Sequence, residues 1–356
     1  MSVLIAGSAV RTCYGNGERT FAALLHGRAL AVPAVDARSA TNDATGQQPV
    51  LAARLLAECL AEAVEQAGLD PSRQRVVALV GTGMRELSAV EDRTAAGSTF
   101  PARCRQLGDL VHQTLPGLAQ VIAISGAGGA GGHVLALAQD LVELGDADVV
   151  IACGADVGPP VGGGHPAGSA RLSGRAGVGR LHGEGAAAVV LVPESWPAGV
   201  LCRLAGTGLS CYAGEEDMAD TAGIGASMRE AFERTGLDPA AVDLVLADAA
   251  AIARADPAEC AALRDVVLAA GGDPLVTSGV SSVNGHPSMV ASLINVDVAL
   301  RCLLEGVVPP VAALPSALNL GLRFTVGEPV LRYPSLVQLD TPGFGGVNAV
   351  TLLEAG

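Results

Sequence analysis

A glycine run in the first half of the chain has the spacing of a phosphate-binding turn. Gly126, Gly128 and Gly131 satisfy the pattern G-x-G-x-x-G between an apolar strand-like segment and an apolar helix-like one. In dinucleotide-binding proteins such glycines let a pyrophosphate approach a helix N-terminus, and an acidic residue follows about 20 positions later, at the end of the next strand. The acidic residues available here lie before that strand or too far along it: Asp146, Asp148 and Asp156. A nicotinamide-dependent oxidoreductase therefore remains one hypothesis.

The same glycines have a simpler explanation. Small residues at the start of a helix let it pack closely against a sheet, and a lone G-x-G-x-x-G match favours this interpretation over a cofactor site. We expect the segment from Gly129 to Leu144, which is apolar almost all round, to be a buried central helix.

The cysteines do not form a metal site or a disulfide framework. They include no C-x-x-C pair and no histidine at metal-ligand spacing, and we expect reduced thiols that mostly fill the core. The sequence thus predicts neither a bound metal nor a cofactor. The eight positions are Cys13, Cys59, Cys104, Cys153, Cys202, Cys211, Cys260 and Cys302.

Short Val- and Ile-rich runs alternate with helix-like segments, as in βαβ units, and the pattern occurs twice. Residues 193–197, Pro-Glu-Ser-Trp-Pro, separate the two series. The sequence predicts an α/β protein with two similar halves, 1–196 and 197–356. The first series has strands at 3–10, 76–83, 121–125, 148–156 and 186–192, with helices at 51–67 and 129–144. The second has strands at 200–210, 243–249 and 274–282, with helices at 222–236, 257–269 and 288–305.

Composition excludes some partners. Half of the 356 residues are apolar, and 22 arginines with no lysine face 36 acidic residues, for a net charge of −14. Nucleic acid is therefore excluded as a partner, and no apolar stretch reaches the ~20 residues that span a bilayer. With no basic leader visible, we expect a cytoplasmic protein. An acidic carrier protein would need a partner subunit or a local arginine cluster, for which the candidates are Arg103, Arg105, Arg171, Arg175 and Arg180.

Several motifs, taken in order, resemble those of β-ketoacyl synthases. The stretch from Ser125 to His133 is similar to the nucleophile turn of that family, which carries its active-site cysteine at the position of Gly128. The resemblance covers nearly the whole chain, with a shorter and poorly matching region between Gly83 and Val121. Further landmarks are Gly15-Asn16-Gly17, Leu24 to Arg28, Gly145 to Ala155, Gly183 to Ala186, Gly285-His286 and Gly343 to Ala349.

The resemblance implies a thiolase-like fold with five layers, α-β-α-β-α, made from two similar βαβ-rich halves. It also implies a dimer formed through the strand that follows the nucleophile turn. The substrates it implies are acyl groups carried as thioesters on the phosphopantetheine of an acyl carrier protein or on CoA.

The catalytic set that the resemblance implies is largely missing. A condensing enzyme needs a thiolate to take the acyl group and two imidazoles to support decarboxylation. Gly128 has no side chain, Asp248 replaces the first histidine, and Ser281 replaces a lysine. The downstream Asp256 and Glu259 identify the Asp248 loop; of the two histidines only His286 remains.

Other residues are placed near the pocket by the same resemblance. The substrate-binding candidates are Ser125, Gly128, Ser281, Phe344 and Asn348, with Pro342 as a stiff element at the pocket mouth. Glu184 and Asn348 are expected to support His286. Plainer roles remain open: His286 as a hydrogen-bonded core histidine, Asp248 as a loop carboxylate, and His133 as a packing residue.

Two function hypotheses follow from the resemblance. The first is a catalytically silent subunit, similar to the chain-length factors of bacterial polyketide or specialised fatty-acid pathways, that shapes the acyl tunnel of an active ketosynthase or pairs with itself. The second is a repurposed acyl-modifying enzyme, in which Asp248 and His286 act as acid and base without a covalent intermediate. The second requires both side chains to converge on one point.

Overall fold

The computed structural model describes residues 2–27, 51–82, 107–156, 183–212, 220–249, 255–311 and 321–356. Most of its strands form one continuous sheet. Their order is β11-β9-β8-β13-β14-β7-β1-β6-β5-β3-β4, and β2 (Gly15–Asn16) pairs with β1. The bounds are β1 Val3–Thr12, β3 Val76–Thr82, β4 Gln120–Ser125, β5 Val149–Asp156, β6 Gly185–Pro193, β7 Cys202–Cys211, β8 Leu244–Leu246, β9 Leu275–Thr277, β11 Arg323–Phe324, β13 Leu336–Pro342 and β14 Val347–Ala355.

The strand order repeats along the chain. In the first half it is β4-β3-β5-β6-β1, and in the second it is β9-β8-β13-β14-β7. If the short strands β2 and β10–β12 are set aside, each half places its third, second, fourth, fifth and first strands side by side. The first three strands in this order pair in parallel, whereas β5–β6 and β13–β14 pair antiparallel. This is the doubled pattern that the sequence predicts. Hydrogen bonds between β1 and β7 join the two sets of strands, so a domain boundary at residue 196 stays a prediction.

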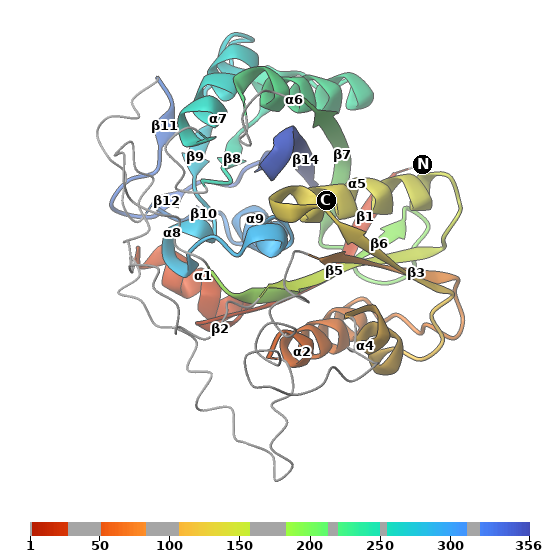
Figure 1. Ribbon diagram of the computed structural model, residues 1–356. Helices are drawn as coiled ribbons and strands as arrows, with labels where there is room; N and C mark the ends of the chain where they lie inside the picture. The colour runs from red at the N-terminus through yellow and green to blue at the C-terminus, as the bar shows by residue number, and fades with distance from the viewer. Residues whose placement is uncertain are drawn as a thin grey trace, which may run out of the picture.

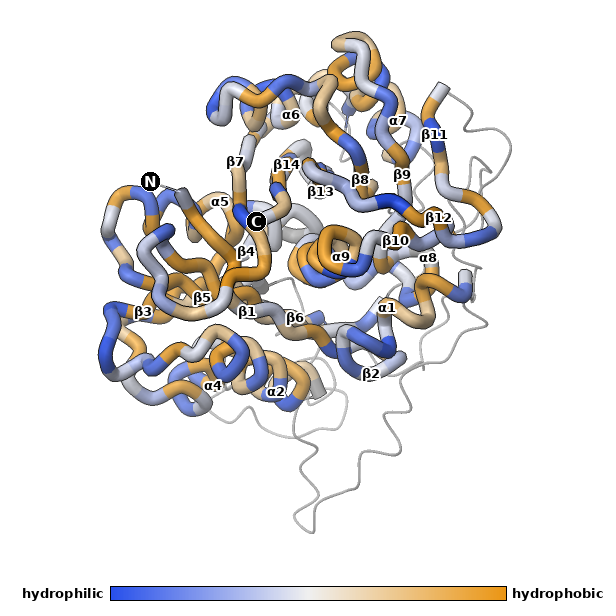
Figure 2. The backbone as a smooth tube through the Cα atoms, turned by 180° about the vertical axis from the view of Figure 1, so that it is seen from behind, coloured by the Kyte–Doolittle hydropathy of each residue, from blue (hydrophilic) through white to orange (hydrophobic). Residues whose placement is uncertain are grey.

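Helices complete a five-layered α/β arrangement, seen edge-on in Figure 1. Helices α2 (Leu51–Gln66) and α4 (Leu107–Thr114) cover one outer face, and α6 (Thr221–Thr235) and α7 (Ala255–Leu263) cover the other. Between the two sets of strands lie α5 (Ala130–Glu143) and α9 (Ala291–Glu305), which contact each other. Helix α9 is buried along most of its length and apolar residues predominate in it, as the colouring of Figure 2 shows. The remaining short elements are α1 Gly17–Leu25, α8 Ser281–Asn284, β10 Val307–Val308 and β12 Val330–Leu331.

Two predicted strands are shorter than the sequence indicates. Strands β8 and β9 end at Leu246 and Thr277, within the predicted ranges 243–249 and 274–282. Beyond Leu246 the backbone N–H groups of Asp248 and Ala249 donate to the Glu259 carboxylate, not to a neighbouring strand. The sheet therefore gives way to a loop at the point where Asp248 stands.

The strand expected to carry a dimer contact cannot do so by edge pairing. Strand β5, which follows the glycine turn, is hydrogen-bonded to β3 on one side and to β6 on the other. Its residues are all buried. The strand at this end of the sheet is β4, which precedes the turn. The expectation of dimerisation through the following strand is corrected accordingly, because a strand paired on both sides has no free backbone groups to offer.

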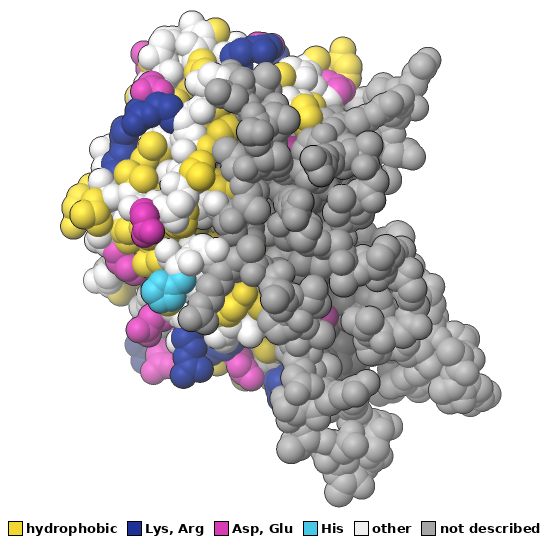
Figure 3. All heavy atoms as spheres, turned by 90° about the vertical axis from the view of Figure 1, so that its left-hand side faces the viewer, with side chains coloured by type: hydrophobic (Ala, Val, Ile, Leu, Met, Phe, Trp, Pro, Cys, Tyr) yellow, Lys and Arg dark blue, Asp and Glu magenta, His cyan; other side chains and the backbone are white. Residues whose placement is uncertain are grey.

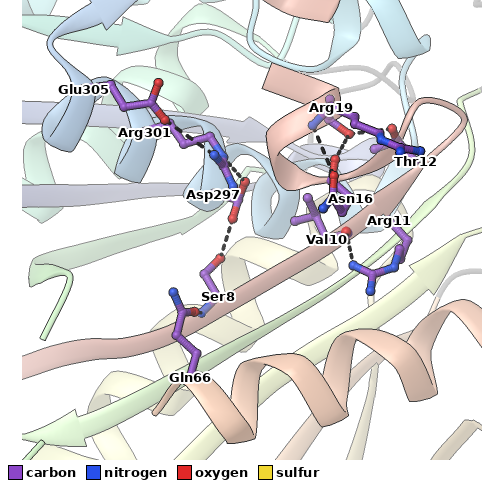
Figure 4. A network of polar contacts seen from close by, with 11 residues as sticks. Ser8, Val10, Arg11, Thr12, Asn16, Arg19, Gln66, Asp297, Arg301 and Glu305 are labelled. Atoms are coloured by element: carbon purple, nitrogen blue, oxygen red, sulfur yellow. Dashed lines mark hydrogen bonds and ion pairs between the residues drawn. The ribbon is translucent and has the colours of Figure 1, made fainter. Parts of the chain in front are cut away.

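A buried polar network fixes α9 against β1 (Figure 4). The Asp297 carboxylate accepts from Ser8 Oγ at 3.2 Å and from Arg301 Nε at 2.9 Å. Burial raises the pKa of Asp297, and the Arg301 and Ser8 contacts oppose that effect. The backbone N–H of Ser8 donates to Gln66 on α2. Ser8 on β1 thus links α2 to α9 through its backbone N–H and its hydroxyl.

We expect Asp297→Ala to lower the free energy of unfolding by about 3 kcal/mol, because it leaves the partly buried Arg301 without its nearest counter-charge. Urea unfolding followed by circular dichroism measures this loss. Asp265→Ala, which removes an exposed carboxylate paired with Arg264, should change stability by less than about 1 kcal/mol. Equal effects of the two variants would contradict the role assigned to Asp297.

Candidate active site

Three loops meet around the N-terminus of α5. The 3₁₀ turn η1 (Ala127–Gly129) contacts both η4 (Ser288–Val290) and η6 (Phe344–Gly346). These turns carry or adjoin the glycine run, His286 and the Gly343 to Ala349 motif. The structure therefore gathers the segments that the sequence analysis singled out at separate positions. Among the described residues, no helix has the length and hydropathy to cross a bilayer.

Close packing accounts for most of the glycines in the run. A Cβ placed at Gly129 would lie 2.7 Å from the Val347 carbonyl oxygen, and one at Gly131 would lie 2.5 Å from the Met289 carbonyl oxygen. A Cβ at Gly132 would lie 2.5 Å from that of Ala349. Real Cβ atoms do not approach so closely, so any larger residue would push α5 away from its neighbours. Close packing thus explains Gly129, Gly131 and Gly132.

Gly128 differs from these neighbours. No heavy atom of the described residues outside its adjoining backbone lies within 4 Å of a Cβ built at this position. The backbone there is not left-handed either. Among the described residues, neither packing nor backbone conformation requires glycine at this position, at which the resemblance expects the nucleophilic cysteine.

Asp248 and His286 form a hydrogen-bonded pair in the interior. The Asp248 Oδ1 atom lies 2.8 Å from His286 Nε2, and each residue is 3% exposed. The Ser288 backbone N–H donates to His286 Nδ1 at 3.1 Å. Because Nδ1 accepts a hydrogen bond, the ring proton lies on Nε2 and is donated to the carboxylate. Both ring nitrogens of this tautomer are engaged.

Strained backbone flanks the pair on both sides. Among the described non-glycine residues, the positive φ angles are those of Ala249, at 47°, and Ser288, at 46°. Ala249 follows Asp248 and hydrogen-bonds to Glu259, whereas Ser288 supplies the N–H that holds His286. Strain of this kind persists only where surrounding contacts hold the backbone. The Asp248–His286 geometry is therefore imposed by its loops.

Buried carboxylates surround the Asp248 loop. Glu259 on α7 accepts from the backbone of Asp248 at 2.8 Å, and Asp340 on β13 accepts from Gln338 Nε2 at 2.7 Å. Burial raises the pKa of Glu259 well above its usual range, and the charges of Asp340, Asp248 and Asp256 add to the effect. Burial likewise raises the pKa of Asp340, to about 7. At least one of these groups stays protonated in mildly acidic solution.

Of the other predicted site residues, Ser281 joins the pair, whereas Asn348 does not. The Ser281 hydroxyl donates to the Asp248 carbonyl oxygen at 2.9 Å. Asn348 is fully buried and donates to the Gly346 carbonyl oxygen and to Ser210 Oγ. It therefore holds the glycine loop against β7, and its assignments to substrate binding and to supporting His286 stay predictions. Ser125 is exposed at the end of β4.

Three further residues named from the sequence are Glu184, His133 and Phe344. The Glu184 carbonyl oxygen accepts from Asn284 Nδ2, and the neighbouring Gly183 N–H donates to the His286 carbonyl oxygen, so this segment supports the His286 loop through its backbone. His133 lies close to the glycine turn, where its Nδ1–H donates to the Gly129 carbonyl oxygen at 2.8 Å. The side chain of Phe344 lies outside the described residues.

Several of the described cysteines are buried in the interior. Burial raises the pKa of Cys13, Cys153 and Cys202 to about 12 in each case, and the charge of Glu184 adds to the effect at Cys13. Such thiols stay protonated and inert at neutral pH. Cys211 at the end of β7 is exposed. Within the described ranges, no three His, Cys, Asp or Glu side chains are arranged to hold a metal ion.

The fold and these motifs resemble those of ketosynthases. Residues 201–314 match the family described as "Beta-ketoacyl synthase, C-terminal domain". The chain thus carries a β-ketoacyl synthase C-terminal domain within a thiolase-like fold. This confirms the family resemblance and the fold class that the sequence predicts.

Two curated proteins share sequence with this chain. Polyketide synthase ThaG of Burkholderia thailandensis is 29% identical over 219 residues, which are 53% of this chain and 4% of that protein. Nodulation protein E of Rhizobium leguminosarum bv. trifolii is 31% identical over 211 residues, which are 54% of this chain and 51% of that protein. The alignments thus span a small part of the first relative and about half of the second.

Solved structures match over the full length of the chain. The ishigamide ketosynthase/chain length factor has a TM-score of 0.81 and 22% identity, covering 100% of this chain and 99% of that one. The ketosynthase complex AntDE:AntF, which contains a type II PKS acyl-carrier protein, has a TM-score of 0.81 and 15% identity with the same coverage. At these identities the likeness establishes the fold.

The buried carboxylates predict a pH-dependent stability. The unfolded chain releases the Asp340 proton near pH 3.8, whereas the native state holds it to about pH 7. The native state thus binds more protons between these values, and the Asp340 contribution to unfolding free energy falls as pH rises from about 4 to about 7, then levels off.

We expect Asp340→Asn, whose amide is always neutral, to flatten this dependence, so that its stability relative to the parent rises from pH 5 to pH 8. Urea unfolding at both pH values measures the difference. Asp265→Asn, an exposed control, should follow the parent at both. If the stability of the parent instead rises relative to that of Asp340→Asn between pH 5 and pH 8, the raised pKa of Asp340 is contradicted.

Proposed function

We propose that this protein is a catalytically silent ketosynthase-like subunit, comparable to a chain-length factor, in bacterial polyketide or specialised fatty-acid biosynthesis. Its role is to shape the acyl tunnel of a ketosynthase partner that carries the cysteine. The observation that carries the proposal is the state of His286, whose two ring nitrogens are taken up by Asp248 and by the Ser288 N–H. An imidazole so engaged has no lone pair for a substrate proton and no spare N–H for an enolate oxygen.

Loss of the nucleophile supports the same proposal. Gly128 offers no group that could accept an acyl chain from a thioester, although the space around its Cα is open among the described residues. Asp248 would present negative charge where the condensation develops an enolate oxygen, and an anion there is opposed by a carboxylate. A protein with these two changes can bind an acyl group but lacks the means to condense it.

An active partner subunit is the second element of the proposal. Strand β4 ends the sheet, and its side chains are partly exposed, with apolar Val121, Ile122 and Ile124 among them. An apolar edge strand with unpaired backbone groups favours association with another strand. We propose that this edge pairs with a cysteine-bearing ketosynthase or with a second copy of the chain, and that acyl carrier protein delivers the substrates.

Charge supports carrier docking through the partner. The described arginines are mostly paired with carboxylates, as in Arg203–Glu354, Arg234–Asp140 and Arg332–Asp243. Basic and acidic side chains are interspersed on the part of the surface that Figure 3 shows in colour. An acidic carrier gains little from arginines already neutralised in this way. The candidate cluster Arg103, Arg105, Arg171, Arg175 and Arg180 lies outside the described residues.

The repurposed enzyme is the alternative, and one observation favours it. Asp248 and His286 do converge on one point, with 2.8 Å between their polar atoms. Acid–base work on an acyl thioester would nevertheless require the buried ring to exchange one of its two hydrogen bonds for a substrate atom. Dehydration, cyclisation or direct acyl transfer would be the reaction classes open to such a pair.

Mixing experiments separate the two functions. We expect acyl- and malonyl-carrier proteins to give an elongated product, seen by intact-protein mass spectrometry, only when a cysteine-bearing ketosynthase is added. Turnover by this protein alone, lost in Asp248→Asn and in His286→Ala but retained in Asp265→Asn, would instead establish the repurposed enzyme. Native mass spectrometry of the mixture measures whether the two subunits associate.

The variant Gly128→Cys tests whether a side chain can be accommodated at position 128. We expect Gly128→Cys to fold and to be alkylated by iodoacetamide and acylated by hexanoyl-pantetheine, because the side chain meets open space at a helix N-terminus that favours the thiolate. Exposed Cys211 serves as the internal control for alkylation in both proteins. The variant should still fail to condense malonyl-pantetheine, since His286 and Asp248 are unchanged. Condensation by this single variant would contradict the silent-site interpretation.

A further inference from the structure

Two buried carboxyl groups, those of Glu259 and Asp340, lie next to the loop that carries Asp248. Each residue is 2% exposed, and the two side chains hydrogen-bond to each other. Two carboxyl groups can do so only if one of them carries a proton. Asp340 Oδ1 accepts from Gln338 Nε2, whereas no donor of the described residues reaches Asp340 Oδ2. A proton shared with Glu259 satisfies this second oxygen, so the geometry fits a pair that holds one proton.

The charges that act on this pair from the described residues are acidic. The carboxylate of Asp248 acts on both members, and that of Asp256 acts on Glu259. Cys260, also on α7, has its pKa raised by burial and by the charges of Glu259, Asp256 and Asp340. Like charges so close in a buried region favour retention of a proton.

Other charged side chains on the elements packed around the pair have partners elsewhere or are exposed. Strand β14 places the apolar Val350 opposite Asp340. The pair therefore depends on its own proton for charge compensation. The side chains concerned are Arg229, Glu230, Glu233 and Arg234 on α6, Asp243 before β8, Arg264 and Asp265 after α7, Arg332 before β13, and Glu354 on β14.

Hydrogen bonds attach the pair to the Asp248 loop. Glu259 Oε1 accepts from the Asp248 N–H at 2.8 Å, and Oε2 accepts from the Ala249 N–H at 3.3 Å. Ala249 has a φ of 47°, a conformation that persists only while its contacts hold it. The Asp248 carboxylate in turn accepts the ring proton of His286. A change of charge on the pair can thus reach the His286 ring through one short, strained loop.

We propose that the proton shared by Glu259 and Asp340 is a pH-sensitive switch, which keeps the Asp248 loop closed on His286 while it is bound and lets the loop open when it is lost to solvent. Without the proton, the carboxylates of the pair and of Asp248 repel one another in the interior. Opening of the strained loop relieves this repulsion and removes Asp248 from the ring. The switch requires neither an acyl ligand nor a partner subunit, so its failure would leave the proposed function untouched.

The direction of the pH dependence follows from the state that holds the proton more tightly. In the open loop Asp340 meets water and titrates near its ordinary pKa of 3.8, whereas in the closed loop it keeps the proton to about pH 7. The closed state binds more protons between these values. The ratio of open to closed loop therefore rises with pH, by up to about tenfold per pH unit, and levels off above about pH 7.

Hydrogen exchange followed by NMR tests the switch. We expect the protection factors of the Asp248 and Ala249 amides to fall about tenfold per unit from pH 5 to pH 7 and to change little above pH 8. The amide of Ala152, in the buried centre of β5, reports global unfolding and should stay better protected at every pH. Loop amides that exchange only as slowly as Ala152, or whose protection is constant with pH, overturn the proposal.

Asp340→Asn tests whether this carboxyl group is responsible, because its amide is neutral and can donate to Glu259 at every pH. Protection of the Asp248 and Ala249 amides should then stay constant from pH 5 to pH 7. Asp265→Asn, the exposed control, should follow the parent. An Asp340→Asn protein with the pH dependence of the parent overturns the proposal. If this variant does not fold, the pH series of the parent, compared with Ala152, still decides.

Release of the His286 ring is measured at a single pH, so that the reagent behaves alike in both proteins. At pH 8 we expect diethyl pyrocarbonate to modify His286 at least about tenfold faster in the parent than in Asp340→Asn, because the open loop is more populated in the parent. Peptide mass spectrometry measures both rates. His112 is exposed and should react equally in the two proteins. Equal rates at His286 overturn the proposal.

Discussion

The central layer of the molecule depends on the absence of side chains at the start of α5. Gly129, Gly131 and Gly132 let this helix approach β14, η4 and the Gly343 loop to distances that no Cβ could tolerate. Through this close packing α5 lies against α9 between the two sets of strands. Because each half contributes one of these helices, the packing of one glycine-rich turn determines how the two halves meet, and with them the three loops of the candidate site.

Within that frame, the polar interior is organised around Asp248. Its carboxylate accepts the His286 ring proton, its carbonyl oxygen accepts from Ser281, and its N–H donates to Glu259. Within the described residues, the donor to this buried carboxylate is the His286 ring, whereas Ser281 and Glu259 hold the Asp248 backbone. The second ring nitrogen of His286 accepts from the Ser288 N–H, so both ring nitrogens are engaged. The same network that satisfies the buried Asp248 therefore also occupies the hydrogen-bonding positions of the His286 ring.

The glycines near the candidate site differ in what surrounds them. Glycines in the turn are required wherever neighbours approach, yet Gly128 itself meets nothing among the described residues. Gly81 and Gly154 make room for the Met289 side chain, supplied from a distant part of the chain.

By itself, the amino-acid sequence determined the α/β class, the doubled strand pattern, the buried helices and the ketosynthase-like order of motifs. Hydrophobic periodicity and short glycine motifs are local properties, so they can be recognised in the sequence. The local patterns of the sequence could not show that β5 is paired on both sides, that Asn348 holds a loop, or that Met289 packs against Gly81 and Gly154. Only the tertiary structure decided the pairing of Asp248 with His286, 38 positions apart, and the raised pKa values of Glu259 and Asp340. These depend on distance and burial between residues brought together from separate strands, which no local pattern records.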